Sequence, residues 1–198
     1  VGFWGSSQQH LLTGKNVPDN WRTRLMGGGY YKLINETNRR ASVGLSTMLW
    51  HYQQDLSGYT LGQGGYYSPQ GYFSLSVPVS YRQRTPDWSW ELGGSGSWSR
   101  SRTDDSRRYP LEGLLPTGLP DRNAPVQGGS SSGFGYTLNA VVEHRLTEHW
   151  RIGGRIDIQQ ADDYAPSHAT LFLRYTFKPW QGDLDMPPQP LTPYADFD

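Results

Sequence analysis

The sequence predicts an all-β protein, an antiparallel transmembrane β-barrel of which this chain holds about the C-terminal half. Three observations support that prediction. Apolar and polar residues alternate with a period of two, the connections between the alternating segments alternate in length, and aromatic residues recur near both ends of the apolar faces. A period of two is typical of strands that present unlike faces to two environments. Amphipathic helix periodicity is nearly absent.

The alternation predicts seven strands and the end of another. It is clearest over 150–160, where one face reads Trp, Ile, Gly, Ile, Ile and the other reads Arg, Gly, Arg, Asp, Gln. In chain order, the predicted strands are the stub 1–5 and the segments 21–34, 41–52, 72–83, 88–101, 136–146, 150–160 and 168–177. Pro78 lies in the middle of its segment. Because proline cannot donate to a strand ladder, it predicts a bulge there.

The connections predict which side of a membrane each strand end faces. Long connections are expected at 6–20, 53–71 and 103–132, short ones at 35–39, 85–87 and 147–149, and an intermediate one at 161–167. Outer-membrane barrels have short periplasmic turns and longer extracellular loops. The alternation therefore places the long connections outside the cell and the end of the last strand in the periplasm.

Aromatic residues lie at intervals that fit the height of a membrane. On the apolar faces, Trp90 and Trp98 are eight residues apart, as are Phe73 and Tyr81. Eight strand residues at about 3.3 Å each, tilted by about 40°, span roughly 20 Å, close to the ~25 Å apolar band of such barrels. Repetition of this spacing favours a membrane barrel over a sandwich core.

Composition narrows the classes of function. Hydrophobic residues make up only 35% of the chain although aromatics reach 14%, which fits either an aromatic-rich soluble β domain or a barrel with a polar lumen. The 18 basic and 18 acidic residues balance, so there is no electrostatic case for nucleic acid. The chain has no cysteine, which excludes disulfides and thiolate metal sites. We expect a neutral ligand such as a sugar polymer, and no cofactor or metal.

Several segments resemble the C-terminal domain of the bacterial cellulose synthase operon protein C family. These segments are the run Tyr-Tyr-Ser-Pro-Gln-Gly-Tyr-Phe-Ser-Leu at 66–75, the segments 77–82 and 88–91, the close at 173–177, Trp180 and the acidic, proline-rich tail. The resemblance implies periplasmic tetratricopeptide repeats followed by a 16-stranded outer-membrane barrel. With seven strands and a stub here, the remaining strands and the repeat domain would lie upstream of Val1.

The resemblance also implies a function. The family would export cellulose, a β-1,4-glucan, through an outer-membrane pore without catalysing a reaction. The implied partners are the cellulose polymer, outer-membrane lipid, the periplasmic repeat domain of the same protein and the inner-membrane cellulose synthase complex, whose synthesis would drive the polymer outward.

The polar faces of the strands supply the candidate residues for contact with a glucan. Aromatic faces can stack on sugar rings, and hydroxyl and guanidinium groups can bond to sugar hydroxyls. The candidates are Arg22, Arg24, Tyr30, Trp50, Tyr52, Arg82, Glu91, Arg151, Arg155, Asp157, Phe172 and Arg174. The alternative is that the charged members form cross-strand ion pairs that only hold the wall together.

Two further segments are candidate constrictions. The connection 103–132 carries Tyr109, Leu111, Leu114 and Leu115, and a loop of that length that is not disordered usually has a function, so we expect it to fold over the extracellular mouth. We assign 1–180 to the barrel and 181–198 to a tail. The predicted anchors of this tail are Trp180, Leu191, Tyr194 and Phe197, which would hold the tail against the inner wall at the periplasmic entrance. A disordered tail is the alternative.

Two rival functions stay open on the sequence. One is an outer-membrane hydrolase or acyltransferase with a site at the rim, where His168 could pair with Asp162 or Asp163. The other is a soluble, aromatic-rich sandwich that binds carbohydrate.

Overall fold

The computed structural model describes residues 1–58, 64–111, 124–161 and 165–188. These residues form one eight-stranded antiparallel sheet and one two-stranded hairpin, with no helix that could cross a membrane. The strands are β1 (Gly2–Gly14), β2 (Val17–Asn35), β3 (Arg39–Tyr52), β4 (Gly71–Arg84), β5 (Trp88–Thr103), β6 (Ser106–Arg107), β7 (Pro125–Val126), β8 (Gly129–Arg145), β9 (Trp150–Gln160) and β10 (Ser167–Tyr175). The predicted fold class is confirmed: the chain is all-β and antiparallel.

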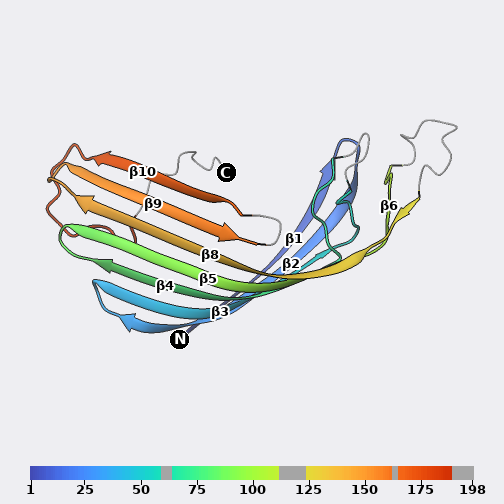
Figure 1. Ribbon diagram of the computed structural model, residues 1–198, viewed down its shortest axis with the longest axis horizontal. Helices are drawn as coiled ribbons and strands as arrows, with labels where there is room; N and C mark the ends of the chain where they lie inside the picture. The colour runs from blue at the N-terminus through green and yellow to red at the C-terminus, as the bar shows by residue number, and fades with distance from the viewer. Residues whose placement is uncertain (59–63, 112–123, 162–164, 189–198) are drawn as a thin grey trace.

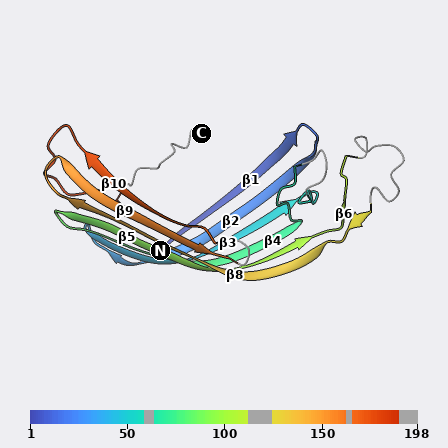
Figure 2. The ribbon, with the colours of Figure 1, turned by 45° about the horizontal axis from the view of Figure 1, so that its top comes forward.

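The main sheet is an open, strongly curved part of a barrel. Its strands follow the order β1-β2-β3-β4-β5-β8-β9-β10, so each strand lies beside its sequence neighbours in the sheet. Figures 1 and 2 show the sheet bent into a trough, with β6 and β7 projecting beyond it. The sheet does not close on itself, because β1 and β10 are its edges. It therefore forms a segment of a barrel wall.

Register fixes which residues share a face. Ser74 of β4 lies opposite Ser99 of β5, and Ser76 lies opposite Ser97. The face that these serines share also carries Ser89 and Glu143, which are buried. Side chains converge on the inside of a curve and diverge on the outside, so burial marks this polar face as the concave one.

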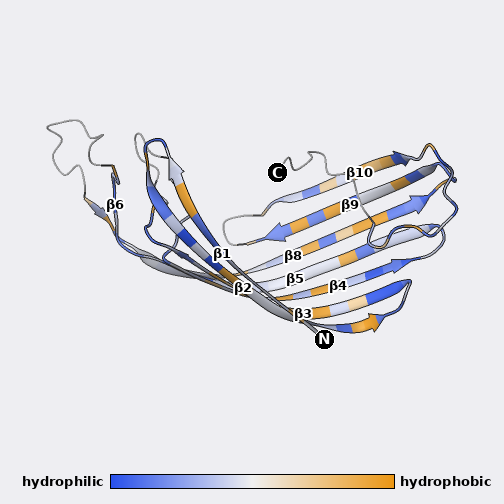
Figure 3. Cartoon of the chain, turned by 180° about the vertical axis from the view of Figure 1, so that it is seen from behind, coloured by the Kyte–Doolittle hydropathy of each residue, from blue (hydrophilic) through white to orange (hydrophobic). Residues whose placement is uncertain are grey.

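The convex face is apolar and uncovered by any other described element. Leu92 is 51% exposed, Ile156 is 52% exposed and Leu171 is 88% exposed. Figure 3 shows the resulting alternation of hydrophilic and hydrophobic residues along the strands. A soluble sandwich buries its apolar face against a second sheet. The described residues contain no second sheet that covers this face.

The first connection differs from the prediction. A long loop was expected at 6–20, but β1 and β2 pair almost to their ends and only Lys15 and Asn16 join them. Asn16 has a φ of 59°, in the left-handed region that asparagine tolerates. In β1 the run from Ser6 to His10 is polar at every position, so no period of two reveals this strand. Loop lengths therefore do not alternate at this hairpin.

Pro78 forms no bulge, contrary to the prediction. On either side of it, Val43 pairs with Val79 and Ser46 pairs with Ser76, so the register of β3 and β4 is unchanged. Gly44 lies beside the ring, and a Cβ atom there would come within 3.2 Å of the proline Cγ. The missing side chain of Gly44 lets the proline stay within a regular strand.

The close approach of Phe172 to Gly153 yields a stability prediction. These residues are register partners, and a Cβ atom at Gly153 would lie 2.2 Å from the Phe172 ring. Gly153→Ala should push the ring from its buried position and lower the free energy of unfolding by about 1–3 kcal/mol. Urea unfolding in detergent micelles, followed by tryptophan fluorescence, measures this loss. Gly96→Ala is the matched control, since a Cβ at Gly96 meets nothing within 4 Å. Equal stability of the two variants would contradict the prediction.

Candidate functional site: the concave face

The register brings all the candidate glucan-contact residues to the concave face. Arg24 lies opposite Trp50, and Arg22 lies opposite Tyr52. Arg82 faces Glu91 across the next strand pair. The candidates of β9 and β10 also lie on this face, where Phe172 is opposite Gly153. Apart from Tyr30, which lies opposite Gly44, they form three groups from one end of the strands to the other.

The first group is aromatic. It lies at the long-loop end, defined as the end of the strands that carries the connections 53–70 and 104–128. The ring centroids of Trp50 and Tyr72 are 5.3 Å apart, and those of Tyr67 and Tyr72 are 6.4 Å apart at 90°. The Arg24 guanidinium lies 6.0 Å from the centroid of Trp50. These rings border a hollow of about 760 Å³ that is otherwise lined mainly by Ser97, Ser99, Ser101, Ser131 and Ser132.

The loop between β3 and β4 holds this aromatic group in place. Asn20 is fully buried, and its side-chain amide donates to the Gln54 carbonyl at 2.9 Å and to the Tyr66 hydroxyl at 3.0 Å. Tyr66 in turn packs on Tyr52, with ring centroids 5.9 Å apart. Burial raises the pKa of the Tyr66 phenol, so it stays a neutral hydroxyl. The loop is therefore anchored on β2 and β3 through buried hydrogen bonds.

Tyr67 and Tyr72 were not among the candidate residues. Tyr72 lies on the polar face of its strand, so the period of two in the sequence could have identified it as a candidate. Tyr67 lies in a loop, where no periodicity indicates a direction. Their shared signal was the run of aromatic residues at 66–73, which served only to mark the family resemblance.

The second group consists of ion pairs between the aromatic group and the short-turn end. Arg82 donates from Nε and Nη2 to one carboxylate oxygen of Glu91, at 3.0 and 2.8 Å. Arg155 binds Asp157 through both oxygens, at 2.5 and 2.9 Å. His168 Nε2 lies 3.1 Å from the same Asp157 carboxylate. Each carboxylate therefore has a basic partner within reach.

The third group lies at the short-turn end, which carries the turns 36–38, 85–87 and 146–149. Glu143 is only 2% exposed, and its two oxygens lie 3.4 Å from Arg151 and 3.5 Å from Arg174. The Arg174 guanidinium also lies 5.9 Å from the centroid of the Phe172 ring. The charged candidates of the second and third groups thus all lie in ion pairs, Arg151 and Arg174 with Glu143, which was not among the candidates. This favours the alternative in which they hold the wall together. The lining keeps an excess of arginine, because Glu143 is shared by two arginines and Arg22 and Arg24 contact His10 and Gln8 instead of a carboxylate.

The first part of the tail contacts the concave face at the short-turn end. Arg84 donates to the Leu184 carbonyl at 3.3 Å, and its guanidinium lies 3.6 Å from Asp183. Ser89 donates to the Asp185 carbonyl at 2.5 Å, and Leu184 is fully buried. Arg145 donates to the Gly182 carbonyl. Trp180, a predicted anchor, is half exposed and donates to the Asp183 carbonyl. The other three predicted anchors, Leu191, Tyr194 and Phe197, lie outside the described residues.

The connection between β5 and β8 leaves the long-loop end beside the loop that follows β3. Its Asp104 backbone N–H donates to the Gln70 side chain at 2.9 Å. A hollow of about 340 Å³ lies between the two connections and reaches Pro110. Tyr109 and Leu111, two predicted gate residues, are half-buried. The other two, Leu114 and Leu115, lie outside the described residues.

The geometry of His168 bears on the enzyme alternative. Its described partner is Asp157, which Arg155 already holds. No described hydroxyl is hydrogen-bonded to His168, as the base of a nucleophile would require. Asp162 and Asp163, the partners weighed from the sequence, lie outside the described residues.

Comparison with known proteins shows the family. The family model described as cellulose synthase operon protein C C-terminus matches residues 1–178. The chain is 60% identical to cellulose synthase operon protein C of Escherichia coli K12, covering 99% of this chain and 17% of that protein. It is 59% identical to the Salmonella typhimurium protein, again over 99% of this chain and 17% of that protein. It is 32% identical to the Pseudomonas fluorescens protein, over 98% of this chain and 15% of that protein.

The chain thus spans about 17% of the length of the Escherichia coli K12 and Salmonella typhimurium proteins, both of which carry the name cellulose synthase operon protein C. The family match covers every strand of the described sheet. On these grounds the chain belongs to the family of the cellulose synthase operon protein C C-terminus.

Proposed function

We propose that this chain forms part of the wall of an outer-membrane pore that exports cellulose. The observation that carries the proposal is the sorting of side chains by curvature. Apolar residues cover the convex face and lie exposed, whereas serines and paired charges cover the concave face. Such sorting suits a wall with lipid outside and a polar conduit inside. The names of the relatives supply the polymer, since they place this family in the cellulose synthase operon.

The proposal includes an orientation and partners. The long-loop end faces the outside of the cell and the short-turn end faces the periplasm, as in other barrels of this class. Further strands from the same protein pair with the free edges at β1 and β10. The polymer arrives through the periplasmic repeats of that protein, and the inner-membrane synthase complex drives it. The pore itself is not an enzyme.

The concave face has the chemistry that a sliding neutral polymer requires. Its ion pairs satisfy their own charges, so they do not trap the chain. Its serine rows offer hydroxyls that can exchange hydrogen bonds with sugar hydroxyls. The rings around Trp50 offer flat apolar surfaces at the exit. A conduit must bind enough to admit its cargo and loosely enough to release it.

Two segments complete the proposed conduit. The tail, bound to Arg84, Ser89 and Arg145, narrows or guides entry at the periplasmic end. The connection between β5 and β8, which includes Tyr109 and Leu111, acts as a gate at the extracellular end. Its described part already contacts the neighbouring loop through Asp104.

The aromatic group should affect export more than an aromatic residue on the convex face. Tyr67 is 52% exposed beside the serine-lined hollow, so Tyr67→Ala should remove a stacking surface without leaving a buried cavity. Loss of one stacking contact of about 0.5–1.5 kcal/mol corresponds to a decrease of roughly 2- to 12-fold. Cellulose secreted by cells that express equal amounts of the variant measures the effect. Trp21→Ala, which changes a convex-face ring, should export normally. An equal decrease in both variants would argue against a lumenal role for Tyr67.

The tail should limit the conductance of the pore. Truncation of the intact protein after Trp180 removes the contacts with Arg84, Ser89 and Arg145 and should raise single-channel conductance in planar bilayers. Leu184→Asp is a milder variant. It places a charge at a fully buried position, so it should release the tail and raise conductance in the same direction. If both variants conduct and export as the intact protein does, the tail neither plugs nor guides the pore.

A further inference from the structure

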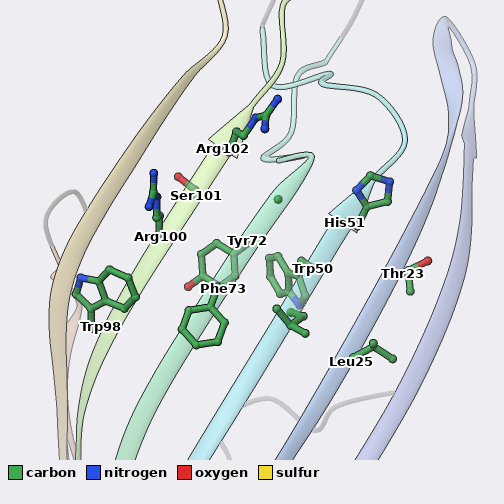
Figure 4. A pocket seen from close by; sticks show the side chains of 12 residues that line it. Thr23, Leu25, Trp50, His51, Tyr72, Phe73, Trp98, Arg100, Ser101 and Arg102 are labelled. Carbon is green, nitrogen blue, oxygen red and sulfur yellow. The ribbon is translucent and has the colours of Figure 1, made fainter.

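A second hollow lies on the opposite, convex face of the sheet at the long-loop end. It has a volume of about 630 Å³ and crosses β2, β3, β4 and β5. Its apolar floor contains Leu25, Leu49, Phe73 and Trp98, with the last two rings 6.1 Å apart. Figure 4 labels Leu25, Phe73 and Trp98 among the side chains that line the hollow. Its lining also includes Trp50, Tyr72 and Ser101, which border the concave hollow as well, but register places Leu25, Leu49, Phe73 and Trp98 on the convex face.

A gap in the outermost row of side chains opens this hollow toward the loops. The register aligns Thr23 with His51, and Gly71 with Arg102. Because Gly71 has no side chain, the row is empty between the histidine and the arginine. A Cβ atom at Gly71 would meet nothing closer than Arg102 Cβ at 3.8 Å, so packing does not demand the glycine. The gap is therefore free to admit a ligand group.

Basic side chains border the apolar floor only on the side of the long loops. Arg100 lies opposite Phe73 and is exposed, with no ion-pair partner among the described residues. Arg102 lies two residues farther along β5, a separation of about 7 Å. Its guanidinium lies 3.1 Å from the Asp104 carboxylate, and both side chains are exposed. An exposed ion pair contributes little to stability, so Arg102 can leave Asp104 for a ligand phosphate. His51 adds an imidazole, whose Nδ1 lies 2.6 Å from the Gln70 carbonyl oxygen.

We propose that this hollow binds lipid A, the phosphorylated and multiply acylated glycolipid that anchors lipopolysaccharide in the outer leaflet. Arg100 and Arg102 would hold its phosphates, and acyl chains would lie over Leu25, Leu49, Phe73 and Trp98. Two arginines at different heights suit a headgroup with more than one phosphate. The breadth of the floor, four strands across, suits several acyl chains rather than one.

This inference rests on the proposed outer-membrane orientation, but not on passage of a glucan. A lipid-binding measurement on the purified protein can fail while export persists, and export can fail while the lipid still binds. The two proposals are therefore tested separately. The residues concerned lie on opposite faces, so Arg100 and Arg102 play no part in the conduit.

The test is a titration of the intact protein in detergent with lipid A, followed by native mass spectrometry. The double variant Arg100→Gln/Arg102→Gln should weaken binding of diphosphorylated lipid A by about tenfold or more, since two charge-assisted contacts are lost. Gly71→Trp should weaken it too, by filling the hollow while leaving both arginines in place. The matched control is Arg39→Gln, which removes an arginine from the convex face at the short-turn end and should bind as the unaltered protein does.

Two arms of the titration identify the ligand. Lipid A stripped of its phosphates should bind the unaltered protein as weakly as diphosphorylated lipid A binds the double variant. Phosphatidylglycerol, an anionic phospholipid, should bind at least several-fold more weakly than lipid A. Equal binding of phosphatidylglycerol and lipid A would overturn the assignment. So would equal binding of lipid A by the double variant and the unaltered protein, or an equal loss in the Arg39→Gln control.

Discussion

The hydrogen-bond ladder between neighbouring strands is the interaction on which the whole structure depends. Within lipid, an unpaired backbone N–H or carbonyl costs roughly several kcal/mol, because no water can replace its partner. Every strand from β2 to β9 in the main sheet is paired on both sides, whereas β1 and β10 each have one free edge. Those edges require further strands before the sheet can lie in a membrane. This chain covers 17% of the Escherichia coli K12 relative, so a protein of that length has room for such strands.

Curvature of the ladder explains how the two faces differ in packing. On the concave side space is scarce, and glycines lie beside large partners, as Gly153 lies under Phe172 and Gly44 beside Pro78. The same crowding buries Glu143 between two arginines. An isolated carboxylate there would be costly, so its partners are essential to the wall. On the convex side the rings stand apart and remain exposed, which is stable only against lipid or another apolar surface.

The sequence predicted most of the strands and the faces of their residues, because a sheet with one apolar and one polar face imposes a period of two. It failed where that contrast ends. In the hairpin of β1 and β2, the run from Ser6 to His10 is polar at every position, so this part of the strand was taken for a loop. Pro78 was expected to form a bulge, because the space beside Gly44 depends on a residue more than thirty positions away. Tyr67 was missed because a loop residue has no face until the loop is anchored by Asn20 and Tyr66.

In the proposed pore, the concave face lines water and the convex face meets lipid. Single cysteines placed along β4 of the intact protein in native membranes test it most directly, through reaction with a small, water-soluble thiol reagent. The account predicts that cysteines at Ser74, Ser76 and Ser80 react, whereas those at Phe73, Leu75 and Val77 do not, because register assigns the two sets to opposite faces. Reaction without alternation, or reaction of the second set alone, would contradict it.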